Sequence, residues 1–160
     1  MTKVGSSLVV KSGSPAQTRR LGARLGRLLR AGDVVLLSGE LGSGKTCLVQ
    51  GIGRGLGVTS PVTSKSFVLL GEYEGRIRLY HADLYRLEEP AQAEELALTE
   101  YAAPGALVVE WAERAWEVFP PEHLLIRLAI AGASQREFAF EARGARYQQL
   151  VDALAKGRRP

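Results

Sequence analysis

A glycine-rich segment at residues 39–46, reading GELGSGKT, constrains this chain more than any other feature of the sequence. It has the Gly-x4-Gly-Lys-Thr spacing of a Walker A phosphate-binding loop. A continuous apolar run at residues 34–38 precedes it, and residues 45–56, with apolar side chains at helical spacing, follow it. Strand, loop and helix in this order are the context that the motif requires. A chance match in a chain with 18 glycines is therefore the weaker interpretation.

Each part of this loop has a role toward a nucleoside triphosphate and magnesium. Backbone N–H groups of a curled glycine-rich loop point at phosphate oxygens, and the next helix adds the positive end of its dipole. Lys45 is expected to pair with the β and γ phosphates, and the Thr46 hydroxyl is a hard oxygen ligand for Mg²⁺. Cys47, just inside the helix, is interpreted as a small core residue rather than a reactive thiol. The residues expected to contact nucleotide here are Glu40, Leu41, Gly42, Ser43, Gly44, Lys45, Thr46 and Cys47.

The rest of the chain alternates strand and helix patterns. Strands are expected at residues 8–10 (an edge strand), 34–38, 67–70, 76–81, 106–111, 124–130 and 136–141, with hairpin turns at 72–75 and around Gly132. Helices are expected from the Ser14-Pro15 start to Gly32 and at residues 45–56, 90–97 and 145–155. This pattern predicts one α/β domain over residues 1–160, with a frayed tail at 156–160. The expected architecture is a P-loop NTPase-like three-layer sandwich with a mixed, mostly parallel central sheet.

The composition of the chain indicates its cellular compartment and its class of partner. No apolar run approaches the roughly 20 residues of a membrane span, and the start of the chain lacks the pattern of a secretory signal. Cys47 is the only cysteine, so an intrachain disulfide is excluded. These features predict a cytoplasmic protein with neither membrane nor DNA as a partner. The net charge of +4 fits either an anionic partner such as RNA or, as we favour, a solvated basic surface.

Two acidic residues follow apolar strands and are candidates for the catalytic half of the site. Asp83 comes after the strand that ends near His81, and Glu110 comes after residues 106–109. Ligands of open α/β sheets gather at the carboxyl ends of the strands. Hydrolysis of a bound triphosphate needs an acid for magnesium and a group that orients water. The alternative is that each acid simply begins a solvent-exposed loop.

Two further motifs resemble those of one known protein family. Residues 81–87, HADLYRL, resemble the His-x-Asp-Leu-Tyr-Arg-Leu signature of the TsaE family, and residues 108–111, VVEW, resemble its Glu-Trp motif. The family is the small ATPase of bacterial tRNA threonylcarbamoyladenosine (t6A) synthesis. The order and spacing agree from about Ser14 to the final helix. One motif differs from the family pattern. Residues 64–67, SKSF, stand where the family commonly has Ser-Pro-Thr-Phe. Residues 60–63 offer a second way to align this motif.

The resemblance implies ATP and Mg²⁺ as cofactors, with Lys45, Asp83 and Glu110 as catalytic residues. Magnesium ligands would come from Thr46, Glu110, Asp83 and Ser66, with the roles of the two acids open to exchange. Ser14, Thr18, Ser66 and Trp111 would join the nucleotide contacts, although Ser14 and Thr18 are equally suited to capping a helix. His81 is interpreted as a packed or hydrogen-bonded histidine, and Arg86 as a partner of phosphate or of an acid.

The implied partners are TsaD, the carbamoyltransferase, and its companion TsaB, with tRNA contacted only indirectly or weakly. A small-molecule kinase is the alternative function, but the insert at residues 90–104 is short and acidic and makes a poor lid. A guanine-nucleotide switch is disfavoured by the absence of an Asn-Lys-x-Asp motif. An RNA-binding module that merely carries nucleotide would need a basic patch with interleaved aromatic residues, whereas the aromatic residues here fall mostly on strands.

Overall fold

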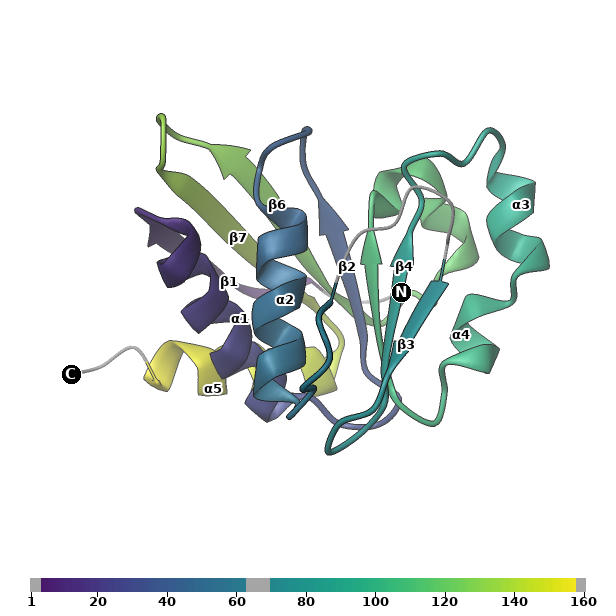
Figure 1. Ribbon diagram of the computed structural model, residues 1–160. Helices are drawn as coiled ribbons and strands as arrows, with labels where there is room; N and C mark the ends of the chain where they lie inside the picture. Colours follow the sequence, from purple (N-terminus) through teal and green to yellow (C-terminus); the bar gives the residue numbers. More distant parts are fainter. Residues whose placement is uncertain (1–3, 63–69, 158–160) are drawn as a thin grey trace.

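The computed structural model describes residues 4–62 and 70–157. All seven described strands join one sheet in the order β1-β7-β6-β2-β5-β4-β3 (Figure 1). The strands are β1 Val4–Ser12, β2 Val34–Ser38, β3 Leu70–Tyr73, β4 Leu79–Asp83, β5 Ala106–Glu110, β6 His123–Ile130 and β7 Arg136–Arg143. The helices are α1 Pro15–Leu28, α2 Lys45–Gly55, α3 Pro90–Glu95, α4 Leu98–Tyr101 and α5 Ala145–Lys156, with two 3₁₀ turns, η1 Ala112–Arg114 and η2 Trp116–Val118.

The sheet is mixed. Strands β6, β2, β5 and β4 are parallel neighbours, whereas β7 and β3 run in the opposite direction. The edge strand β1 is antiparallel to β7 and therefore points the same way as β6. Five of the seven strands thus share one direction, which confirms the prediction of a mixed, mostly parallel sheet.

Helices cover both faces of the sheet. Successive side chains of a strand point to opposite faces. Val35 and Leu37 accordingly belong to a core that includes residues of α1, α2 and α5, whereas Val34 and Leu36 belong to a second core with residues of α3 and α4. Because β2 is apolar on both faces, it suits an interior strand of a sheet that is covered on both sides. The predicted three layers are present.

Helices α1 and α2 lie side by side on one face (Figure 1). Gly22 and Gly26 of α1 oppose Gly51 and Gly55 of α2, and a Cβ atom added at Gly51 would collide with the carbonyl oxygen of Arg19. The lack of side chains therefore lets the two backbones touch. The contacts advance together along both helices, so the helices are parallel and present their N-termini to the same edge of the sheet.

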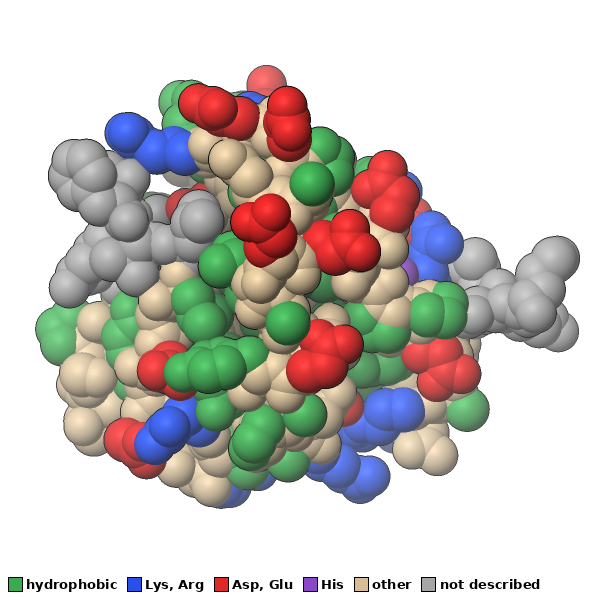
Figure 2. Space-filling model, turned by 90° about the vertical axis from the view of Figure 1, so that its right-hand side faces the viewer, with side chains coloured by type: hydrophobic (Ala, Val, Ile, Leu, Met, Phe, Trp, Pro, Cys, Tyr) green, Lys and Arg blue, Asp and Glu red, His purple; other side chains and the backbone are tan. Residues whose placement is uncertain are grey.

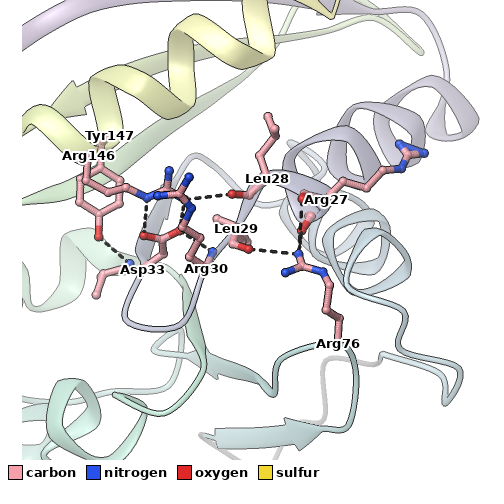
Figure 3. A network of polar contacts seen from close by, with 10 residues as sticks. Arg27, Leu28, Leu29, Arg30, Asp33, Arg76, Arg146 and Tyr147 are labelled. Carbon is pink, nitrogen blue, oxygen red and sulfur yellow. Dashed lines mark hydrogen bonds and ion pairs between the residues drawn. The ribbon is translucent and has the colours of Figure 1, made fainter.

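Two arginines hold the opposite end of α1 (Figure 3). Arg76 donates hydrogen bonds to carbonyl oxygens at the C-terminal end of the helix, including that of the C-cap residue Leu29 at 3.0 Å. Arg146 donates to the Leu28 carbonyl at 2.9 Å and binds Asp33 through Nε and Nη2 at 2.9 and 2.7 Å. The hydrogen bond to Asp33 raises the pKa of Arg146. Carbonyls at a helix C-terminus have no partner within the helix, so these arginines satisfy them.

The expected hairpin at residues 67–81 forms, but its turn is shifted. Glu72 and Tyr73, predicted to lie in the turn, belong to β3 and pair with Tyr80 and Leu79. The physical reason is that Tyr73 packs against the core, so the chain reverses only after it. Residues 67–69 of the expected strand lie outside the described residues. The hairpin of β6 and β7 is confirmed.

The helix predictions need smaller corrections. The helix expected at 90–97 ends at Glu95, because Ala97 adopts a left-handed φ of 47°, and the short helix α4 follows it unpredicted. Helix α5 ends at Lys156, one residue beyond the predicted end, and the fraying expected of residues 156–160 stays a prediction. Residues 158–160 lie outside the described part. Within the described residues, no helix is both long and apolar enough to cross a bilayer.

Candidate functional site at the glycine-rich loop

The glycine-rich loop connects the carboxyl end of β2 to the first turn of α2. Gly42 and Gly44 have φ values of 82° and 104°, in the left-handed region that favours glycine. Gly44 is also the N-cap of α2 and provides no side-chain cap. The N–H groups of the first helical turn are consequently left for an external acceptor such as a phosphate oxygen.

A hollow of about 300 Å³ opens beside this loop. It is lined by residues from the loop, from α2 and from the carboxyl ends of β4 and β5: Leu41, Gly42, Gly44, Lys45, Thr46, Cys47, Asp83, Tyr85, Glu110 and Trp111. We call it the loop hollow. It brings together most of the residues that the sequence predicts for the site, and they come from three separate strand ends.

Lys45 is buried, and its amino group is held by the loop itself. Nζ donates to the carbonyl oxygens of Gly39 and Glu40, the second at 2.9 Å, and lies 4.0 Å from the centre of the Trp111 ring. Burial lowers the pKa of Lys45, while nearby carboxylates, led by Glu110, act in the opposite direction. The ammonium group therefore has only backbone carbonyls and a hydroxyl as hydrogen-bond acceptors, and a phosphate oxygen is a stronger acceptor for such a cation.

The two predicted acids lie next to each other. Asp83 and Glu110 are register partners in the parallel pair of β4 and β5. Thr46 Oγ1 donates to Glu110 Oε1 at 3.1 Å, which ties the hydroxyl after the loop lysine to the acid of β5. Asp83 Oδ1 accepts a hydrogen bond from the Tyr85 N–H at 2.9 Å. The alternative, that each acid simply begins a solvent-exposed loop, is excluded for Glu110, which is 2% exposed.

His81 binds the other oxygen of Glu110. Its Nε2 lies 2.6 Å from Glu110 Oε2, and both side chains are buried. Glu110 is thus held at both oxygens, by Thr46 on one side and His81 on the other. The interpretation of His81 as a hydrogen-bonded histidine is confirmed.

An aromatic group closes one side of the loop hollow. The rings of Tyr85 and Trp111 lie 4.9 Å apart, and the Arg114 guanidinium lies 5.7 and 5.8 Å from them. Trp111 adopts a left-handed φ of 59°, a strained conformation for this residue type, which turns the chain from β5 into η1. The indole lies over Lys45, whereas Glu110, the preceding residue, is the last residue of β5.

Comparison with known proteins identifies the family. A sequence model described as threonylcarbamoyl adenosine biosynthesis protein TsaE matches residues 12–138. The chain belongs to the TsaE family. It is 39% identical to the tRNA threonylcarbamoyladenosine biosynthesis protein TsaE of Bacillus subtilis over 145 residues, covering 89% of this chain and 90% of that protein. The corresponding protein of a Nostoc species is 52% identical over 103 residues, covering 61% and 63%. The crystal structure of Bacillus subtilis YdiB superposes with a TM-score of 0.79 at 32% identity, covering 99% of both chains.

Several residues that the TsaE resemblance implied lie outside the loop hollow. Ser14 caps α1 by accepting from the Gln17 N–H at 3.1 Å, and Thr18 is buried with its hydroxyl 2.8 Å from Ser12 Oγ. Both therefore have a structural role, and their nucleotide contact stays a prediction. Ser66 lies outside the described residues. Arg86 is exposed and does not line the hollow.

Cys47 lines the loop hollow, but it is not an activated thiol. Its Sγ donates to the Pro15 carbonyl at 3.3 Å, and burial raises its pKa. This contact also shows that the start of α1 lies beside the loop, so that two parallel helices direct their N-termini toward it. The interpretation of Cys47 as a small core residue is wrong, because its side chain is half-exposed and belongs to neither core.

Sequence reasoning missed two members of this TsaE family site. Tyr85 lines the loop hollow and packs on Trp111. Glu113 contributes to the charge around Lys45, and its carboxylate oxygens are buried with no hydrogen-bond partner in the described part of the chain. Tyr85 could have been found, because it lies within the HADLYRL motif. Glu113 carries no comparable signal, since its position depends on the turn at Trp111.

Proposed function

We propose that this chain is the Mg²⁺-dependent ATP-binding and ATP-hydrolysing subunit required for t6A modification of tRNA. In this proposal it acts with TsaD and TsaB in the cytoplasm, and ATP turnover resets the assembly between rounds of modification. Membership in the TsaE family supports the tRNA-modification role. The P-loop NTPase-like reading of the fold rests on the parallel strands β2 and β5 with the glycine-rich loop between β2 and α2.

The observation that carries the proposal is the contact of Thr46 Oγ1 with Glu110 Oε1 beside Lys45. A hydroxyl and a carboxylate at 3.1 Å form the kind of hard-oxygen pair that Mg²⁺ prefers, and Asp83 supplies a second carboxylate in the loop hollow. The described residues contain no group of three or more His, Cys, Asp and Glu side chains suited to a metal. This fits Mg²⁺, which is usually bound through one or two carboxylates plus substrate phosphates and water.

Each residue then has a defined task in hydrolysis. Thr46 and Glu110 would hold the magnesium ion, which when bound neutralises charge on the β and γ phosphates. Lys45 exchanges the carbonyls of Gly39 and Glu40 for phosphate oxygens and adds a second positive charge. Asp83 accepts a hydrogen bond from the attacking water and orients it toward the γ phosphate.

The test is Mg²⁺-dependent ATP turnover of the chain alone and with TsaB and TsaD. We expect slow turnover alone and strong stimulation by the partners, both lost in Lys45→Ala. Lys156→Ala is the matched control, because it removes an exposed lysine at the far end of α5. Glu110→Ala is expected to weaken the Mg²⁺ dependence.

Two results would contradict the proposal. Turnover that TsaB and TsaD leave unchanged, together with phosphate appearing on a small acceptor, would favour a small-molecule kinase. Glu110→Ala with unaltered magnesium affinity and turnover would show that the metal site is assigned to the wrong residue.

A further inference from the structure

Arg136, the first residue of β7, joins the β6–β7 hairpin to the glycine-rich loop. Its Nη1 donates to two carbonyl oxygens of the hairpin turn, those of Gly132 at 3.0 Å and Gln135 at 2.8 Å. Its Nε donates to the Gly42 carbonyl oxygen at 3.2 Å, across 94 positions of the sequence. One guanidinium group therefore bonds the turn and the loop at the same time. Arg136 does not line the loop hollow.

The contact with Arg136 fixes the direction of the peptide between Gly42 and Ser43. In a trans peptide, the carbonyl and the next N–H point to opposite sides. The Gly42 carbonyl points to Arg136, so the Ser43 N–H points into the loop, where it donates to the Glu40 carbonyl at 3.1 Å. Lys45 Nζ donates to the same carbonyl oxygen at 2.9 Å. An N–H group and an ammonium group thus converge on one acceptor, as they would on a phosphate oxygen.

Gly42 itself offers little resistance to a change of this orientation. Glycine adopts its φ of 82° freely, but adopts many other values as freely. Gly42 is exposed, and a Cβ atom added to it would meet no atom within 4 Å, so packing does not hold it. The start of the loop differs, because a Cβ atom on Gly39 would lie 2.6 Å from the carbonyl oxygen of Leu128 in β6. Strand β6 therefore supports the start of the loop by packing, and the hydrogen bond from Arg136 supports its middle.

Arg136 bonds carbonyl oxygens rather than carboxylates. Within the described part of the chain it takes part in no ion pair. Figure 1 places α3 and α4 at the opposite end of the sheet from β7, and Figure 2 shows Asp and Glu side chains gathered on that distant side. The hydrogen bonds of Arg136 are charge-assisted, and such bonds are roughly twice as strong as those between neutral groups.

We infer that Arg136 is a positioning residue for nucleotide binding, which holds the peptide between Gly42 and Ser43 so that its N–H is directed toward phosphate. The inference rests on the proposed function for the identity of the nucleotide, which is ATP or its product ADP. Arg136 acts through the Gly42 carbonyl and not on the reacting atoms. It therefore contributes to the affinity for nucleotide and not to the rate of the chemical step.

The test measures the binding of ADP with Mg²⁺ by calorimetry, so that turnover does not disturb the titration. Arg136→Met removes the donors and keeps an apolar stem. We expect the Kd for ADP and the KM for ATP to rise about tenfold, and kcat to stay within about twofold. Arg127→Met is the matched control, because Arg127 is an exposed arginine of the same hairpin whose Nε bonds Glu141 and not the loop. The control should bind ADP within about twofold of wild type.

Arg136→Lys separates the hydrogen bonds from the charge. Lysine keeps the positive charge, but its single ammonium group lacks the planar fork that reaches the turn and the loop together. We expect this variant to bind ADP at least about threefold more weakly than wild type. Amide hydrogen exchange at residues 42–44, measured without nucleotide, should be faster in both Arg136 variants, whereas urea unfolding should change little.

Three results would overturn the inference. They are an unchanged ADP affinity in Arg136→Met, full recovery of affinity in Arg136→Lys, which would assign the effect to charge alone, and a general loss of stability with unchanged exchange at residues 42–44. In each case, loss of ADP binding in Lys45→Ala would leave the proposed function standing. If wild type binds no ADP, the proposed function fails first and the inference falls with it.

Discussion

Replacing His81 with alanine tests whether this residue positions the catalytic acid. Its Nε2 lies 2.6 Å from Glu110 Oε2, and the two side chains are 4% and 3% exposed. A hydrogen bond to a charged group contributes about 1.5–3 kcal/mol, and the unpaired buried carboxylate adds to the loss. We therefore expect His81→Ala to lower the free energy of unfolding by about 3 kcal/mol. A group that orients a metal ligand typically changes metal affinity by about 10–100-fold, so the Mg²⁺ concentration for half-maximal turnover should rise about tenfold or more.

Two variants separate positioning from packing. His81→Gln can place an amide N–H near Glu110, so it should recover much of the magnesium dependence. His123→Ala is the matched control, because His123 is also a buried histidine but bonds the Pro120 carbonyl, away from the site. It should cost stability without altering the Mg²⁺ requirement. Urea unfolding and magnesium titrations of turnover measure the two effects, and an unchanged magnesium titration in His81→Ala would refute a positioning role.

Three further predictions concern stability, each read from urea unfolding. Asp33→Ala leaves the Arg146 guanidinium without its carboxylate and should cost about 3 kcal/mol; a loss under about 1 kcal/mol would mean that the network of Figure 3 is dispensable. Burial lowers the pKa of His123 below its usual value of 6.5, so the folded state favours the neutral ring. The free energy of unfolding of wild type should therefore fall as the pH drops below 6.5, and it should fall less steeply in His123→Leu. Gly51→Ala would collide with the Arg19 carbonyl and should cost about 1–3 kcal/mol, whereas a neutral effect would show that α1 and α2 can separate.

The sequence predicted the loop and the acids because both signals are local. The loop needs eight consecutive residues and the strand before it, and Asp83 and Glu110 each follow an apolar run. Parallel strands then bring their carboxyl ends to one edge, so two separate local signals predict one site. The three layers followed from apolar runs that are buried on both faces, of which β2 is an example.

The features that could not be predicted from the sequence depend on pairing between distant residues. The contact of His81 with Glu110 spans 29 positions and follows only from the register of β4 on β5. The strand order, which inserts β6 and β7 between β2 and β1, also has no local signal. The turn at residues 72–75 was misplaced because Gly75 marks a turn locally, whereas the packing of Tyr73 decides where β3 ends.

The register of β5 supports a division of labour between the two acids. Glu110 is paired with Leu37 of β2 on one side and with Asp83 of β4 on the other, so it lies between the strand that leads into the loop and the second acid. Its Oε1 reaches Thr46, the hydroxyl expected on magnesium, and its Oε2 is fixed by His81. Asp83 is one strand farther from the loop and less buried, which suits a group that must exchange water during turnover. If the two roles were exchanged, the metal would lie on Asp83, which is farther from the Thr46 hydroxyl. Glu110, which is held at both oxygens, would then have to orient a mobile water. This geometry supports the proposal that Glu110 binds the metal and Asp83 orients the water.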